Sequence, residues 1–316
     1  MSSPILALVV PCYNEELVIA KTIDYLSSYL ESLMQSKQVS DKSYIVFVDD
    51  GSHDQTWNII RENSNREPVK IKGIKLAKNF GHQYALLAGL KSCINKCDCS
   101  ISIDADLQQE PEAIVKFLTE FSKGNDIVFG VRNDRKTDSF MKKFTAGFFY
   151  SLMKTMGVKL VRNHADYRLV SNKVLNVLDQ YTESNLFLRG VFSNFGFKTS
   201  VVLHEVRLRE AGESKYSVKK MLALAFDGIT SFSTVPIKLI TACGFLTFIF
   251  SFLMICYVIL MKLLGKAVVG WASTLLPIYF IGGIQLLSLG LIGEYVGKIY
   301  KEVKRRPNYV IEEEIQ

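Results

Sequence analysis

Two long stretches without a charged residue constrain the fold more than any other feature of the sequence. They are Leu239–Met261 and Ala267–Gly293. Each exceeds the roughly 20 residues that an α-helix needs to cross the hydrocarbon core of a bilayer. Two buried core helices are the alternative, but core helices of this length usually keep a polar face. We therefore expect two transmembrane helices, at 237–263 and 267–297, that follow a domain folded in water.

The basic residues around these stretches predict a topology. The loop between the two stretches contains only Lys262 and Lys266. The flanks are richer in positive charge, with Lys215, Lys219, Lys220 and Lys238 before the stretches and Lys298, Lys301, Lys304, Arg305 and Arg306 after them. By the positive-inside rule, both flanks are cytoplasmic and the loop faces outward. The apolar start Ile5–Val10 is short and lacks a basic leader, so it is typical of a strand rather than of a signal peptide. We expect a multi-pass protein of the cell (inner) membrane with both termini in the cytoplasm.

The net charge of +7 fits this location, because basic side chains beside a bilayer attract anionic headgroups. Nucleic-acid binding is the competing interpretation, but the basic residues are not interleaved with aromatic residues as in the known binding modules. Cys93, Cys97 and Cys99 form a cluster without a fourth Cys or His nearby, so a structural zinc site is not expected. Free thiols in a reducing compartment are the simpler interpretation.

The first half of the chain alternates β-rich runs with helical patterns, which predicts a mainly parallel sheet covered by helices. The expected strands are Ile5–Val10, Tyr44–Val48, Ile71–Leu76, Ser100–Ile103 and Asp126–Gly130. The expected helices are Glu15–Leu33, Asp54–Asn63, Gln83–Cys93 and Glu112–Ser122. Lys136–Leu203 looks mixed and helical, and its elements cannot be ordered from the sequence. We assign 1–212 to this α/β domain, 213–236 to an amphipathic juxtamembrane segment and 298–316 to a cytoplasmic tail, disordered after Pro307.

Acidic clusters follow the predicted strands. In open α/β sheets, ligands bind beyond the carboxyl ends of the strands, which is where these clusters lie. The first strand is followed by Pro11-Cys12-Tyr13-Asn14-Glu15 and the second by Asp49-Asp50-Gly51-Ser52. Such loops can hydrogen-bond a ribose or a base, although either could also be an ordinary turn with a helix cap. Asp104 and Asp106 come directly after the fourth strand, with Gln108 close behind. Two carboxylates in this position can bind Mg²⁺ or Mn²⁺, which takes oxygen ligands and bridges substrate phosphates.

Arginines form a second group of candidates, because a guanidinium presents a planar, permanently charged fork to a phosphate. Arg132 and Arg135 follow the fifth strand. Asp166-Tyr167-Arg168 and Arg207-Leu208-Arg209 lie further along, the second pair just upstream of the first apolar stretch. A basic cluster there could hold a lipid phosphate at the bilayer surface. Interfacial charges that only contact headgroups are the alternative.

Taken together, these motifs resemble the family 2 glycosyltransferases of the GT-A (Rossmann-like) fold. The resemblance is to the polyprenyl-phosphate glycosyltransferases, which include bactoprenol glucosyltransferases and dolichyl-phosphate-mannose synthases. It covers nearly the whole chain and keeps the order of the motifs. The matching stretches are VVPCYNEE, VDDGSHDQT, AKNFGHQYALLAG, DADLQQEP, GVRNDR, DYRL, REAGESKYS and ITSFSTVPIK.

The resemblance implies roles for individual residues. Asp104, Asp106 and Gln108 would hold Mg²⁺ or Mn²⁺, and Asp166 is the family's candidate base. Arg132 and Arg209 would hold the acceptor phosphate or the diphosphate. The nucleoside would be held by Pro11, Tyr13, Glu15, Asp49, Asp50 and the basic Lys78. His82-Gln83 stands where Lys-Glu is common, and Tyr167 replaces Phe.

The implied activity is inverting transfer of a sugar from a nucleotide sugar, such as UDP-glucose or UDP-N-acetylglucosamine, to a membrane polyprenyl phosphate, for cell-surface glycan modification. The second pKa of a phosphate monoester is about 6, so the acceptor is ionised at neutral pH and needs no strong base. Asp166 would then orient the acceptor or balance charge. A processive polysaccharide synthase is an alternative, but the Gln-x-x-Arg-Trp segment of that class is missing. A non-catalytic scaffold is a third hypothesis, disfavoured by the closely spaced charges. Two helices are compatible with a homo-oligomer, which no residue pattern requires.

Overall fold

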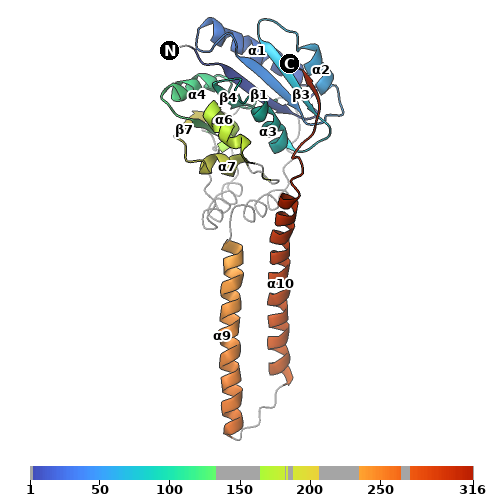
Figure 1. Cartoon of the computed structure of the whole chain (residues 1–316), viewed down its shortest axis with the longest axis vertical. Coiled ribbons are helices and arrows are strands. Elements are labelled where there is room, and N and C mark those ends of the chain that lie inside the picture. The colour runs from blue at the N-terminus through green and yellow to red at the C-terminus, as the bar shows by residue number, and fades with distance from the viewer. Residues whose placement is uncertain are drawn as a thin grey trace. The chain divides into compact units, whose positions relative to one another are not determined.

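The structure is a computed structural model that describes residues 3–132, 164–181, 183, 188–205, 235–264 and 271–315. The chain divides into two compact units (Figure 1). The first unit comprises Met1–Tyr150, Lys159–Tyr216 and Arg306–Gln316. The second unit comprises Ser151–Val158 and Ser217–Arg305. The second unit is therefore inserted into the sequence of the first.

One twisted sheet forms the centre of the first unit. In the described part of the chain its strand order is β7-β5-β6-β4-β1-β2-β3-β8. Strands β4, β1, β2 and β3 are parallel neighbours, as are β5 and β7, whereas β6 and β8 run antiparallel to their neighbours. The strands are β1 (Leu6–Cys12), β2 (Tyr44–Asp49), β3 (Lys70–Leu76), β4 (Cys99–Ser102), β5 (Ile127–Arg132), β6 (His164–Ser171), β7 (Thr199–His204) and β8 (Ile311–Ile315).

The helices of the first unit connect these strands. They are α1 (Ile19–Gln35), α2 (Thr56–Glu62), α3 (His82–Ser92), α4 (Ala113–Ser122), α6 (Asn172–Asp179) and α7 (Leu188–Asn194). In α1 the buried residues Ile19, Ile23, Leu26 and Leu30 recur every three or four positions, so they form one apolar face. Every residue of β1 and β2 is buried, as expected for parallel strands covered on both faces.

Helix α3 lies unusually close to the sheet because Gly89 faces it. A Cβ atom at Gly89 would lie 2.4 Å from Cγ1 of Val9 and 2.9 Å from Cγ2 of Val48. These distances are shorter than ordinary carbon–carbon contacts. Only a residue without a side chain therefore permits this approach of α3 to the sheet.

The structure confirms the predicted α/β fold class. Each of the five strands and four helices expected in the first half is present, with end points shifted by up to four residues. The expectation for the tail is wrong, because Ile311–Ile315 forms the edge strand β8 instead of a disordered end. The domain expected at 1–212 thus also includes the last residues of the chain. The amphipathic segment 213–236 lies almost entirely outside the described residues.

The second unit contains two long helices, α9 (Val235–Leu263) and α10 (Trp271–Val303). Large apolar side chains on both are exposed, including Phe245 at 64% and Leu286 at 73%. Among the described residues, one helical segment, Phe280–Val303, is long and apolar enough to cross a membrane. Within α9, the shorter apolar stretch Val235–Thr247 is found. These findings agree with the second expected span and leave the first as a prediction.

Candidate active site

The loops that follow β1 and β2 are joined by reciprocal hydrogen bonds. The backbone N–H of Asn14 donates to Oγ of Ser52 at 2.9 Å, and the N–H of His53 donates back to Oδ1 of Asn14 at 3.0 Å. The N–H of Glu15 donates to Oγ1 of Thr56 at 2.9 Å. Because β1 and β2 are parallel neighbours, their carboxyl ends lie at the same edge of the sheet. The two sequence motifs therefore form one structure.

Asp49 and Asp50 are both buried and already accept hydrogen bonds from the protein. Asp49 accepts from the hydroxyl and the N–H of Ser52. Asp50 accepts from the N–H groups of Phe80 at 2.8 Å and Gly81 at 2.9 Å, so it fixes the segment after β3. Burial raises the pKa of both carboxyls above the ordinary value, and these hydrogen bonds oppose the rise. In this structure the pair shapes the loops around the predicted nucleoside site.

Gly51 allows the loop after β2 to contact the segment after β3. Its φ is +68°, and a Cβ atom there would lie 2.4 Å from the carbonyl carbon of Lys78. Any other residue would be strained in its backbone and would displace the Lys78 backbone. The segments after β2 and β3 are therefore held against each other.

Asp104 is held by Gln109. Nε2 of Gln109 donates to Oδ2 of Asp104 at 2.6 Å, and Oε1 of Gln109 accepts the N–H of Asp104 at 2.9 Å. Asp106 accepts the N–H of Gln108 at 3.2 Å. Between these residues, Leu107 has a φ of +51°, and the resulting turn folds the two glutamines back toward the aspartates. Gln109 is buried, whereas Asp104, Asp106 and Gln108 are partly exposed.

Asp166 is the centre of a buried charged cluster. Oδ1 accepts from Nη2 of Arg168 and from Nε of Arg189 at 3.2 Å. Oδ2 accepts from Nη2 of Arg189 at 2.8 Å and from Nε2 of Gln83 at 3.2 Å. Nε2 of His82 lies 3.4 Å from Oδ2 of Asp166 and 3.9 Å from Oδ1 of Asp104. His82 therefore lies between the two aspartates.

The structure of β6 and α7 explains this cluster. Because β6 is antiparallel to β4, its first residues lie next to the end of β4 that leads to Asp104. Arg168 is fully buried, with its guanidinium 4.8 Å from the ring centroid of Phe192 in α7. Arg189, also in α7, reaches Asp166 while its side chain stays 33% exposed. The cluster thus has one fully buried arginine and one that solvent can reach.

The charges of this cluster determine its protonation. Burial alone would raise the pKa of Asp166, but Arg189, His82 and Arg168 hold it well below the ordinary value. Burial would lower the pKa of His82, and Asp166 and Asp104 together raise it above the ordinary value. Burial raises the pKa of Asp104, which His82 partly offsets. Asp166 is therefore a permanent negative charge at neutral pH.

The other predicted site residues are distributed around this edge. Pro11 is buried and Tyr13 and Glu15 are partly buried in the loop after β1. Lys78 is exposed, with Nζ 5.2 Å from the ring centroid of Phe80. Arg132 ends β5, exposed and in register with His204 of β7. Arg135, Arg207 and Arg209 lie outside the described residues.

Sequence reasoning missed two residues that the structure brings into the site. Gln109 adjoins the predicted ligand Gln108, and the adjacent Gln-Gln pair gave no sign of which side chain holds Asp104. Arg189 lies in the region whose elements could not be ordered, and no local motif marks it. His82 and Gln83 were noticed only as departures from the family pattern, yet both contact Asp166.

The donor set fits Mg²⁺ or Mn²⁺ only in part. Asp104 and Asp106 offer hard oxygen atoms one residue apart, as these ions prefer. Among the described residues there is no group of three or more His, Cys, Asp or Glu side chains that could hold a metal ion. Mg²⁺ usually keeps several waters and is bound through one or two carboxylates together with substrate phosphates.

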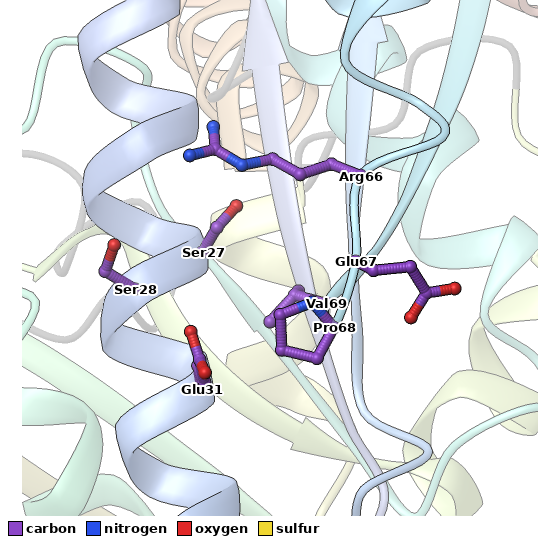
Figure 2. Close-up of a pocket in the computed structure, with 7 residues that line it drawn as sticks. All are labelled: Ser27, Ser28, Glu31, Arg66, Glu67, Pro68 and Val69. Atoms are coloured by element: carbon purple, nitrogen blue, oxygen red, sulfur yellow. The ribbon is translucent and has the colours of Figure 1, made fainter.

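A small pocket of about 90 Å³ lies away from this site, between α1 and the segment that leads into β3 (Figure 2). In Figure 2, Arg66 extends toward α1 and Glu67 points away from it. The pocket lies at the N-terminal end of β3, whereas the acidic clusters follow the C-terminal ends of the strands. Its lining residues are Ser27, Ser28, Glu31, Arg66, Glu67, Pro68 and Val69.

Comparison with known sequences agrees with this geometry. The sequence model described as glycosyl transferase family 2 matches residues 7–179, which contain every acidic residue of the site. The chain belongs to glycosyl transferase family 2. This confirms the family resemblance inferred from the motifs, and it makes the chain a glycosyltransferase by membership.

Two relatives match nearly the whole length of the chain. The chain is 49% identical over 98% of its length, and 92% of the relative, to the uncharacterized glycosyltransferase YkoT of Bacillus subtilis (strain 168). It is 38% identical over 97% of both chains to the SfII prophage-derived bactoprenol glucosyl transferase of Shigella flexneri. Among solved structures, it resembles glucosyl-3-phosphoglycerate synthase from Mycobacterium tuberculosis with 15% identity and a TM-score of 0.44, over 72% of this chain and 78% of that chain. That last likeness is too distant to support an argument about this chain.

Proposed function

We propose that this glycosyltransferase transfers one sugar from a nucleotide sugar, such as UDP-glucose or UDP-N-acetylglucosamine, to a polyprenyl phosphate in the membrane. The observation that carries the proposal is the Asp104–His82–Asp166 arrangement, with Arg168 and Arg189 on its far side. It places the partly exposed Asp104 near His82 and the solvent-accessible Arg189, as expected for a site that handles a diphosphate and a phosphate together. The relatives named bactoprenol glucosyl transferase support the choice of lipid.

The residues would divide the work between donor and acceptor. The loops after β1, β2 and β3 would bind the nucleoside, with Tyr13 and Lys78 available at their surface. Asp104 and Asp106, with Gln108 as the third ligand expected from the family resemblance, would hold Mg²⁺ or Mn²⁺. The metal ion would neutralise negative charge on the departing diphosphate. Arg189, together with Arg132 and Arg209, would hold the acceptor phosphate.

The reaction is a displacement at the anomeric carbon. A phosphate oxygen of the acceptor forms the new bond as the bond to the diphosphate breaks, and the configuration inverts. Because the acceptor is ionised at neutral pH, no proton must be removed from it. Asp166, whose oxygens accept hydrogen bonds from Arg168, Arg189 and Gln83, would act by orienting the two arginines.

A direct test uses the full chain in detergent or nanodiscs with a polyprenyl phosphate, Mg²⁺ or Mn²⁺, and a panel of UDP- and GDP-sugars. Mass spectrometry should detect a lipid carrying a single sugar with one of these donors. A polymer would indicate a processive synthase instead. If no donor yields product while the chain is folded, the proposal is wrong and a scaffold role gains support.

The same assay tests the acidic pair. Asp104→Ala and Asp106→Ala should each abolish transfer without unfolding the protein, because both side chains are partly exposed. Substitution of the exposed Asp41, in the loop before β2, provides a matched control that should keep full activity. Undiminished activity in either site variant would reject the metal assignment.

A further inference from the structure

The C-terminal strand β8 completes the sheet on the side of the predicted nucleoside site. It pairs antiparallel with β3, with Gly73 opposite Ile315 and Ile74 opposite Glu314. The ladder continues past the end of β3, where the N–H of Ala77 donates to the carbonyl of Val310 at 2.9 Å. The tail therefore covers an edge that would otherwise present unpaired N–H and C=O groups.

Side chains also anchor the strand. Nε1 of Trp57, in α2, donates to Oε2 of Glu313 at 2.9 Å. Nζ of Lys75, in β3, lies 3.1 Å from Oε2 of Glu312. Glu313 and Ile315 are partly buried on one face, whereas Glu312 and Glu314 are exposed on the other. These contacts add to the backbone pairing and tie β8 to α2 as well as to β3.

Two of the residues that β8 contacts, Lys75 and Ala77, connect it to the acids of the nucleoside loops. Lys75 lies opposite Asp49 in the β2–β3 ladder and helps to lower the pKa of that carboxyl, against the larger effect of burial. Ala77 begins the segment whose Phe80 and Gly81 N–H groups bind Asp50. Trp57 lies in the helix that follows the Asp49–Thr56 loop. The tail therefore contacts β3 and α2, the two elements on either side of the Asp50–Gly81 contact.

We propose that β8 is a positioning element for the nucleotide, and that Glu312 and Glu313 of the tail fix the loops that bind it. This inference rests on the proposed function, because it assigns the tail to the same donor site. Docking of the tail holds the Ala77–Gly81 segment in place before the nucleotide arrives. A pre-formed loop binds more tightly than one that must be ordered on binding.

The test removes the tail and separates donor affinity from turnover. A chain that ends at Pro307 should bind its nucleotide about tenfold more weakly, as expected when a hydrogen-bonded loop loses its support. At saturating donor, kcat should stay within about twofold of the intact chain, because the Asp104–Asp166 region is untouched. Titration calorimetry with Mn²⁺ and whichever of UDP or GDP the intact chain binds measures the first quantity, and the transfer assay measures the second.

Point variants make the test independent of truncation. Glu313→Ala should weaken nucleotide binding about fivefold through loss of one partly buried hydrogen bond. Glu313→Gln, whose amide oxygen can still accept from Trp57, should restore affinity. Glu314→Ala is the matched control on the same strand and should bind normally. A synthetic peptide of residues 308–316 added to the truncated chain should recover affinity, and a scrambled peptide should not.

Two results would overturn the proposal. The first is unchanged nucleotide affinity in both the truncated chain and Glu313→Ala. The second is a fall of kcat in Glu313→Ala with no change in nucleotide affinity. An intact chain that binds neither UDP nor GDP would instead count against the proposed function, so the two failures are distinguishable.

Discussion

Asp166 pairs with two arginines that differ in their exposure to solvent. It neutralises Arg168, which is fully buried, and it orients Arg189, which solvent reaches. The pKa of Asp166 lies well below its ordinary value. The group therefore stabilises the fold above the unfolded pKa of about 3.9, and this contribution is lost only as the pH falls through the lower folded pKa. Near neutral pH the cluster should be insensitive to pH through Asp166.

Replacement of Asp166 should destabilise the protein as well as inactivate it. Asp166→Ala leaves the Arg168 guanidinium buried without its counter-charge, which typically costs about 3–5 kcal/mol. Thermal unfolding of the purified protein should show a large drop in Tm. Asp106→Ala, at a partly exposed position, should keep a Tm close to that of the parent chain. A stable but inactive Asp166→Ala protein would contradict this structural role and support a purely catalytic one.

Gln109 should control the affinity for the metal ion through its grip on Asp104. Gln109→Ala removes both hydrogen bonds that hold Asp104, and partners of this kind typically contribute about 10–100-fold to metal affinity. The concentration of Mn²⁺ that gives half-maximal activity should rise accordingly. Gln108→Ala, which removes the proposed third ligand, should raise this concentration as well. An unchanged Mn²⁺ requirement in Gln108→Ala would reject Gln108 as a ligand.

The elements that could be predicted share one physical property. Strands β1 to β5 are apolar runs bounded by polar or turn residues, so burial and chain direction are visible in the local sequence. In β6, Asp166 and Arg168 are buried because they satisfy each other across the fold, which no local pattern reveals. In β8, Glu312–Glu314 looks like a solvated run of acids, and its pairing depends on β3, far away in the sequence.

The same division holds in the site. Asp104 and Asp106 were found because they follow an apolar strand directly. Arg189 was not, because its partner Asp166 lies on another element and the two meet only after β6 and α7 have folded. Local sequence thus predicts the site residues that directly follow strands. The residues that hydrogen-bond or pair with other site residues come together only through tertiary contacts.

Helix α3 should not tolerate a methyl group at its contact with the sheet. In an exposed helix Gly→Ala is stabilising, by about 1 kcal/mol. Gly89→Ala should instead destabilise by about 1–3 kcal/mol, because the new Cβ overlaps Val9 and Val48. Unfolding in denaturant measures this change in free energy. Adding Val9→Ala should recover part of the loss, and an absence of recovery would place the strain elsewhere.

The whole chain should behave as an integral membrane protein. Phe280–Val303 is apolar, and its large side chains are exposed in the structure. Burial of such a segment in lipid does not depend on salt, unlike the attraction of surface charges to headgroups. Membranes washed with molar salt and then with alkaline carbonate should retain the protein, and detergent should release it. Release by salt alone would show that charge holds it there.

The pairing of β8 with β3 has a consequence for how often the chain can cross a bilayer. A single hydrogen-bonded sheet cannot have strands on opposite sides of a membrane, so residues before and after the second unit share one compartment. A path that leaves a compartment and returns to it makes an even number of crossings. If Phe280–Val303 crosses, the chain must make an odd number of further crossings, and therefore at least one, between β7 and that segment. The parity of the crossings is thus determined by the five residues of β8.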